Sequence, residues 1–419
     1  MLLADRIEQL ETAFREKGWP TDLLQRAIEL RFPKDMLLRW AREGWANAEF
    51  ISRRLDWHDR LTRGDLRGRE ATLQDNEAFQ ELWANSPEEL GEWEVTTERG
   101  PNAFAQFLLQ EHVTVLVLEQ QGSLIATCAF ASRIVNVAGT QLPVHYGQAL
   151  RVHKDHRRRG YGDQVRSLGW AIGGAKPTIA QFDYMRSQNF AVVNWWQKYS
   201  PGFFDDVPKR EGDVPGISVA VLQYPARGFD GDSSGIRTAR RDDISRCVAL
   251  INRTHRGDDL FRTYTEEFLL ERLGAGYSGP HLDRWIGPER QQSVYGLNDF
   301  YVVEEGGRVV ACAGLWDRGR DVRDRWRHIV TGDGKVVETT AVLDIGFVRG
   351  HGQALSRLLG FLIGETNRLG RDFLTVPLDR FPRVAAMLGH YEPVPEVRAL
   401  RWGVADPKIT RPHTDLVYW

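Results

Sequence analysis

The chain has 419 residues, 42% of them hydrophobic and 27% charged, which is the balance of a folded protein with two or three domains. Its 55 Lys and Arg nearly cancel its 57 Asp and Glu, so no global field attracts nucleic acid or anionic lipid. It contains no apolar run of about 18 residues, no signal-like start, and only three Cys, so we expect a cytoplasmic protein without a membrane segment, disulfide framework or zinc site.

Residues 1–60 are predicted to form a helical extension. The first helix carries one apolar stripe, made by Leu3, Ile7, Leu10 and Phe14. It ends at the Gly18-Trp19-Pro20 stop signal. A second helix runs to Phe32-Pro33, and a third helical stretch spans about residues 34–55. We interpret this segment as a cap on the domain that follows, and a dimerisation arm is the alternative.

An internal repeat divides the rest of the chain. Residues 117–130 read VLEQQGSLIATCAF and residues 302–315 read VVEEGGRVVACAGL, two predicted β-hairpins offset by 185 positions. A helix-like stretch precedes each hairpin, at 72–83 and 239–251, and a Gly-x-Gly pair follows each, with the pairs 190 positions apart. We therefore predict two copies of one domain. Their boundaries are 66–226 and 235–405, with a Gly/Asp/Ser-rich linker at 227–235 and a tail at 406–419.

The first Gly-x-Gly pair lies in the segment with the clearest chemistry. Val144–Val152 is rich in strand formers, and helical spacing of apolar residues begins after Gly160. Glycines 160 and 162 allow close backbone approach, and the helix start offers unpaired N–H groups at the positive end of the dipole. Three arginines stand beside it, at 157–159. Together these features predict a pyrophosphate-binding turn.

The pattern differs from two other phosphate loops. A Rossmann fingerprint needs a small residue where Val165 stands, and no G-x-x-x-x-G-K-[ST] motif occurs. The R-x-x-G-x-G sequence after a strand resembles the coenzyme A loop of the GNAT superfamily of N-acyltransferases. That resemblance implies an α+β fold of two tandem GNAT-like domains, each a mixed, mostly antiparallel twisted sheet flanked by helices, after the N-terminal helical segment.

The resemblance also implies a cofactor site for acyl-CoA, most simply acetyl-CoA. Strand residues Leu150, Arg151 and Val152 would hold the acyl carbonyl and pantetheine arm through their backbone. The residues expected at the pyrophosphate are Arg157, Arg158, Arg159, Gly160, Tyr161, Gly162 and Asp163.

The implied reaction is direct acyl transfer from the thioester to an amine of a small molecule or a protein. Family members often place a Tyr four residues before a Gly-Phe pair, to protonate the leaving thiolate. Here Lys198 holds that position and Tyr199 follows it, so Tyr199 is the candidate acid, with a packing role as the alternative. If the loop absorbs an insertion, Trp196 holds the position of the family Tyr instead. His145 is the candidate base, and the other candidates are Gln148, Glu111 and His112.

The second copy departs from the motif. Phe347 stands where the leading Arg or Gln belongs, and Arg349 is the single basic residue before Gly350 and Gly352. We expect this copy to be degenerate in cofactor binding. Two other functions remain open: a non-catalytic acyl-CoA-binding or regulatory module, and a nucleic-acid-binding protein that uses residues 156–159. A monomer and a homodimer are both compatible with the sequence.

Overall fold

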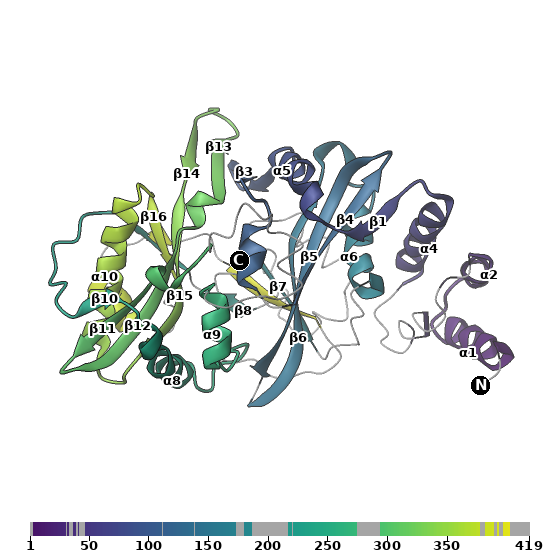
Figure 1. Cartoon of the computed structure of the whole chain (residues 1–419). Coiled ribbons are helices and arrows are strands. Elements are labelled where there is room, and N and C mark those ends of the chain that lie inside the picture. The colour runs from purple at the N-terminus through teal and green to yellow at the C-terminus, as the bar shows by residue number, and fades with distance from the viewer. Residues whose placement is uncertain are drawn as a thin grey trace.

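We describe the fold from a computed structural model of the chain. The described residues are 3–30, 32, 37, 38, 41, 47–110, 112–137, 139–172, 180–186, 217–219, 221–274, 294–377, 382–388, 392, 393 and 397–402. Two sheet-containing halves lie side by side, and the N-terminal helices lie at the outer end of the first half (Figure 1). None of the helices in the described ranges is long and apolar enough to span a membrane.

The N-terminal helices are α1 (Leu3–Glu16), α2 (Thr21–Glu29) and α4 (Ala48–Arg63). Their apolar stripes meet in a small separate core that includes Leu10, Phe14 and Trp19. Helix α4 extends beyond the predicted stretch of residues 34–55. It ends because Gly64 adopts a positive φ of 80°, which is the usual way for a glycine to terminate a helix.

The first sheet is assembled around the predicted 117–130 hairpin. Its strand order is β1 (Arg67–Glu70), β4 (Val113–Gln120), β5 (Ser123–Val137), β6 (Thr140–Val152), β7 (Ala180–Arg186), β18 (Val397–Trp402) and β8 (Ile217–Val219). Every pairing is antiparallel except that of β6 with β7. Alternate residues of β4 face opposite sides: Val115 and Val117 pack with the core of α5 (Asn76–Ala84), and Leu116 and Leu118 pack with α6 (Tyr161–Ile172).

The second sheet repeats this plan. Its order is β10 (Ile236–Thr238), β11 (Phe300–Glu305), β12 (Arg308–Trp316), β15 (Thr339–Phe347), β16 (Phe373–Val376), β9 (Leu222–Pro225) and β17 (Glu392–Pro393). Again one pairing is parallel, that of β15 with β16. The helices of this half are α8 (Ile244–Thr254), α9 (Glu266–Arg272), α10 (Gly352–Arg368) and α11 (Pro382–Leu388).

The two copies match in detail. Both predicted hairpins are present, each with a register shift at the same place, between Leu118 and Glu119 in the first and between Val303 and Glu304 in the second. In both copies one arginine of the first strand binds two carboxylates: Arg69 contacts Asp75 and Glu119, and Arg237 contacts Asp243 and Glu304. The tandem arrangement of one α+β domain is therefore confirmed.

Strands cross between the two halves in a way that the sequence did not predict. Strand β9 precedes the linker but pairs with β16 of the second sheet, and β18 near the end of the chain pairs with β7 of the first. A third sheet joins the halves, in the order β14 (Gly334–Val337), β13 (Val322–His328), β3 (Trp93–Arg99) and β2 (Glu88–Leu90). The domain boundaries 66–226 and 235–405 stay a prediction, and each copy completes its sheet with a strand from the other segment.

Candidate active site

The candidate site starts at an opening in the first sheet. Strands β6 and β7 pair from Val144–Gly147 with Ala180–Asp183, and their described residues show no pairing beyond that point. Just after it, Ala149 adopts a positive φ of 54° at a register shift that bends β6 away. Residues 148–152 therefore present a strand edge that β7 does not cover, and we call it the open edge of β6. Backbone N–H groups of this edge that β5 does not use are placed to contact a ligand, whereas the Leu150 and Val152 carbonyls already accept from the Arg151 and Arg157 side chains.

The pyrophosphate-binding turn predicted at residues 157–163 follows this edge directly. A short 3₁₀ helix, η3 (Lys154–His156), leads into it, and Arg158 and Gly160 both have a positive φ, of 62° and 81°. A Cβ added to Gly160 would meet no atom of the described residues within 4 Å, so they leave the space in front of this glycine open. The N–H groups of the first α6 turn have no acceptor inside the helix, which leaves them available at the positive end of the dipole.

The three arginines of the turn have different surroundings. The Arg157 Nε donates to the Val152 carbonyl at 3.4 Å, and its Nη2 donates to the Pro87 carbonyl, so this side chain ties the turn to the fold. Arg158 and Arg159 are exposed. Arg158 and Arg159 are thus free of the contacts that hold Arg157, and a phosphate contact from any of the three arginines stays a prediction.

The start of α6 is held on both sides. Tyr161 is 3% exposed and packs in the apolar cluster under the helix, and a Cβ on Gly162 would lie 3.4 Å from Val152 Cγ2. Asp163 is held by Arg54 of α4: Nη2 donates to Oδ1 at 2.9 Å and Nη1 to the backbone carbonyl at 2.8 Å. This predicted cofactor residue thus anchors the N-terminal helices, and no sequence pattern pointed to Arg54.

The three predicted strand residues lie on the open edge but face different sides. Leu150 and Val152 pack toward α6, whereas Arg151 lies 4.2 Å from the centre of the Trp83 ring of α5 and pairs with Glu88. The open edge therefore connects the α6 side of the sheet, where the turn lies, with the α5 side.

His145 lies on β6 two residues before the pairing with β7 ends. It is 9% exposed, and its Nδ1 is 2.5 Å from Ser132 Oγ of the neighbouring strand. Burial lowers the pKa of His145 below its ordinary value, so the ring is neutral at pH 7. Its Nε2 is buried without a hydrogen-bond partner among the described residues. A neutral, positioned imidazole with one free nitrogen can accept a proton.

Of the other predicted catalytic residues, four lie outside the described residues and two can be placed. Tyr199, Trp196 and Lys198 lie outside the described residues, as does Glu111. Gln148 forms reciprocal hydrogen bonds with Gln110, so its amide is engaged within the fold. His112 is exposed at the start of β4.

The second copy keeps the opening but fills it with its own side chains. Asp344 occupies the bulge of β15 with a φ of 56°, matching Ala149 in the first copy. Its carboxylate accepts hydrogen bonds from Tyr264 at 2.7 Å and Tyr295 at 2.9 Å and is 3.2 Å from the Arg272 guanidinium. This buried network stands where the first copy has only a methyl group.

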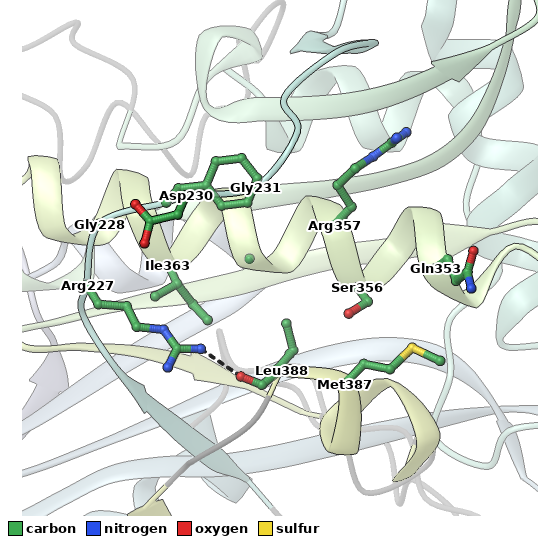
Figure 2. A pocket seen from close by; sticks show the side chains of 12 residues that line it. Arg227, Gly228, Asp230, Gly231, Gln353, Ser356, Arg357, Ile363, Met387 and Leu388 are labelled. Atoms are coloured by element: carbon green, nitrogen blue, oxygen red, sulfur yellow. Dashed lines mark hydrogen bonds between the residues drawn. The ribbon is translucent and has the colours of Figure 1, made fainter.

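A cavity of about 660 Å³ lies elsewhere in the second copy, between the 227–231 segment, α10 and α11. Figure 2 shows Ser356 directed into it, with Arg227 bound to the Leu388 carbonyl at its edge. Phe229 packs against the glycines of α10 there, 3.4 Å or less from a Cβ placed at Gly360 or Gly364. The cavity runs along the side of α10 rather than at the bulge of β15, so it does not reproduce the geometry of the first copy.

Comparisons with known proteins agree with this fold. No protein-family model and no curated protein sequence matches the chain. Two structures of Saccharomyces cerevisiae N-myristoyltransferase with bound myristoyl-CoA match 82% of it at 12% identity, with TM-scores of 0.56 and 0.54, and the match covers 80% and 84% of those chains. A GCN5-related N-acetyltransferase from Sphaerobacter thermophilus matches 84% of this chain and 98% of its own at 15% identity, with a TM-score of 0.44. The chain thus has the fold of the N-myristoyltransferase structures, and the predicted tandem GNAT-like fold is confirmed.

Proposed function

We propose that this protein is an acyl-CoA-dependent N-acyltransferase whose reaction takes place in the first copy. The observation that carries the proposal is the adjacency of the pyrophosphate-binding turn and the open edge of β6. The turn offers N–H groups and two exposed arginines to a diphosphate, and the edge offers backbone groups to a pantetheine arm and a thioester. The known ligand of a protein with this fold, myristoyl-CoA in the yeast enzyme, supports the same class of substrate.

The chemistry assigned to the chain is direct transfer. The amine nitrogen attacks the thioester carbonyl carbon, the C–S bond breaks, and the CoA thiolate takes a proton from a general acid, for which Tyr199 is the candidate from the sequence. A backbone N–H of the open edge stabilises the oxyanion, because it is fixed in place before the charge develops. His145 Nε2 takes the proton that the amine loses, and Ser132 positions the ring. Because its neighbours Val144 and Tyr146 pack on the α5 side, His145 faces the α6 side, so an amine on the α5 side passes its proton to His145 through water. The acyl group is most simply acetyl, and the acceptor is an amine of a small molecule or a protein.

Gly160 offers a direct test of the binding site. Asn and Asp have the same shape and both tolerate a positive φ, so Gly160→Asn and Gly160→Asp differ only in charge. A carboxylate about 4 Å from a phosphate costs about 1 to 4 kcal/mol between water and a protein surface. We expect calorimetry to show acetyl-CoA bound at least about fivefold more weakly by the Asp variant than by the Asn variant. Equal affinities would remove the proposal.

Thiol release with acetyl-CoA and a panel of amines then separates an enzyme from a binding module. The acyltransferase releases CoA in an amine-dependent manner. Charge-dependent binding of acetyl-CoA with no release on any amine would instead identify a non-catalytic acyl-CoA-binding protein. Repeating the assay with longer acyl-CoA molecules determines which acyl group the first copy prefers.

A further inference from the structure

A buried guanidinium group lies where the two halves meet. Arg99 is the last residue of β3, pairs with Val322 of β13, and is 7% exposed. Its Nη2 donates to the neutral Gln106 side chain at 3.1 Å. Its Nε and Nη1 are buried and have no hydrogen-bond partner among the described residues. A charged group buried in this state costs several kcal/mol unless something pairs with it, so the fold alone does not account for Arg99.

The charges around Arg99 add to the imbalance. Two of the three charged groups that act on it most strongly, Arg318 and Arg151, are themselves guanidinium groups, and the third is Asp324. Asp324 already accepts from Thr97 at 2.9 Å and is 3.4 Å from Arg318. Burial, together with these two arginines, lowers the pKa of Arg99 to about 9. The side chains around Arg99 therefore leave its positive charge without a negative partner.

Two polar atoms near the end of α5 also lack hydrogen-bond partners among the described residues. Its guanidinium carbon lies 3.9 Å from the centre of the Trp83 ring, and Arg151 lies 4.2 Å from the same ring centre. Trp83 Nε1 and Ser86 Oγ, at the end of α5, are buried with no hydrogen-bond partner in the part of the chain that the structure describes. Helix α5, which carries Trp83, lies beside β3, which carries Arg99 (Figure 1). Unsatisfied donors that gather in one place indicate a missing acceptor.

This region is adjacent to the proposed reaction centre. Arg151 follows Leu150 on the open edge of β6, which connects the α6 side, where CoA would bind, with the α5 side. On the α5 side of this edge lies Arg151, and the Trp83 ring that it contacts also contacts the buried Arg99. The positive charge that is left unmatched in the fold is thus placed to contact the acceptor rather than CoA.

We propose that Arg99 binds the carboxylate of the acceptor, which makes the substrate class a zwitterionic amine such as an amino acid or a short peptide. The inference rests on the proposed acyl transfer, because that reaction places the acceptor here. A carboxylate supplies the one negative charge and the oxygen acceptors that Arg99 lacks. The role is one of binding and orientation, and no bond forms or breaks at Arg99.

Three variants test the assignment. Arg99→Met removes the charge at similar length, and Arg99→Lys keeps it. Arg325→Met is the matched control, because Arg325 lies on β13 of the same sheet, exposed and paired with Glu98. Because the buried Arg99 guanidinium has no carboxylate partner, its desolvation outweighs its contacts with Gln106 and Trp83, so we expect Arg99→Met to keep or raise the thermal midpoint of the ligand-free protein. A clear fall in that midpoint, absent in Arg325→Met, would instead make Arg99 a structural residue.

Binding is tested with N-acetylglycine and its amide, N-acetylglycinamide, which differ only in the carboxylate. We expect N-acetylglycine alone to raise the thermal midpoint of the native chain and of Arg325→Met, with the effect lost in Arg99→Met and partly kept in Arg99→Lys. Equal responses to both compounds, or protection by chloride and N-acetylglycine alike, would overturn the proposal.

Turnover is tested with alanine and alaninamide as acceptors of the acetyl group. We expect the native chain to favour alanine by about tenfold or more in kcat/KM, since a hydrogen bond to a charged group is worth that much, and Arg99→Met to lose the preference. Calorimetry with acetyl-CoA must give the same affinity for Arg99→Met and the native chain. If Gly160→Asp loses acetyl-CoA binding while Arg99→Met keeps it, the proposed function is supported. If the native chain then shows no preference for alanine over alaninamide, only the carboxylate site at Arg99 is overturned.

Discussion

Replacing Arg54 by Met tests whether the N-terminal helices hold the pyrophosphate-binding turn in place. The side chains of Arg54 and Asp163 are 8% and 13% exposed, and two hydrogen bonds join Arg54 to Asp163. Removing one partner of a buried ion pair typically costs 3–5 kcal/mol. Because Asp163 lies in the first turn of α6, where the helix dipole favours a carboxylate, we expect the low end, about 3 kcal/mol.

Hydrogen exchange measures this loss where it occurs. The opening free energy of the first α6 turn should fall by about 3 kcal/mol in Arg54→Met, while the amides of α10 in the second half keep their protection. Without Arg54, the Asp163 carboxylate also adds negative charge to the turn that we propose binds the diphosphate, so acetyl-CoA affinity should fall about fivefold. Adding Asp163→Asn to Arg54→Met removes that charge and should restore the affinity. Unchanged exchange and unchanged affinity in Arg54→Met would refute the reasoning.

Three further predictions concern other parts of the chain. Asp344→Asn leaves a buried guanidinium without its carboxylate and should destabilise the second half by about 3–5 kcal/mol in thermal unfolding, while acetyl-CoA affinity in the first copy stays the same. Gly364→Ala places a Cβ 2.6 Å from Phe229 and should lower the free energy of unfolding by about 1–3 kcal/mol in the same measurement. Gly360→Ala, where the distance is 3.4 Å, should be neutral or stabilising. Equal effects of the two substitutions would contradict the packing of the linker residue Phe229 against α10. Because burial lowers the pKa of His145 below 6.5 in the folded chain, the unfolded chain takes up the proton first as the pH falls. Stability should therefore drop below about pH 6.5, and His145→Gln should lessen that drop in the thermal midpoint.

Local features of the sequence predicted local structure well. The 117–130 and 302–315 hairpins formed because each has a turn with residues of positive φ, such as Gly122 and Gly307, between alternating apolar residues. The strand at 144–152 and the helix after Gly160 also formed as predicted. A glycine signal at Gly64 would have corrected the end of α4, since a glycine just past a helical stretch commonly ends it.

Long-range pairing left no such signal. The exchange of β9 and β18 between the sheets depends on contacts between strands far apart in the chain, which no local periodicity encodes. The same holds for the pairing of β3 with β13, which encloses Arg99, and for the contact of Arg54 with Asp163. A single arginine on a helix or strand resembles any solvated charge in the sequence, and its role became visible only with its burial and partners.

The most direct test of the central claim is a crystal structure with bound acetyl-CoA. We expect the diphosphate to contact the backbone N–H groups of residues 160–162 and the thioester to lie along residues 148–152, beside Ala149. Acetyl-CoA bound only in the cavity beside α10, or at any site away from the open edge of β6, would contradict the central claim.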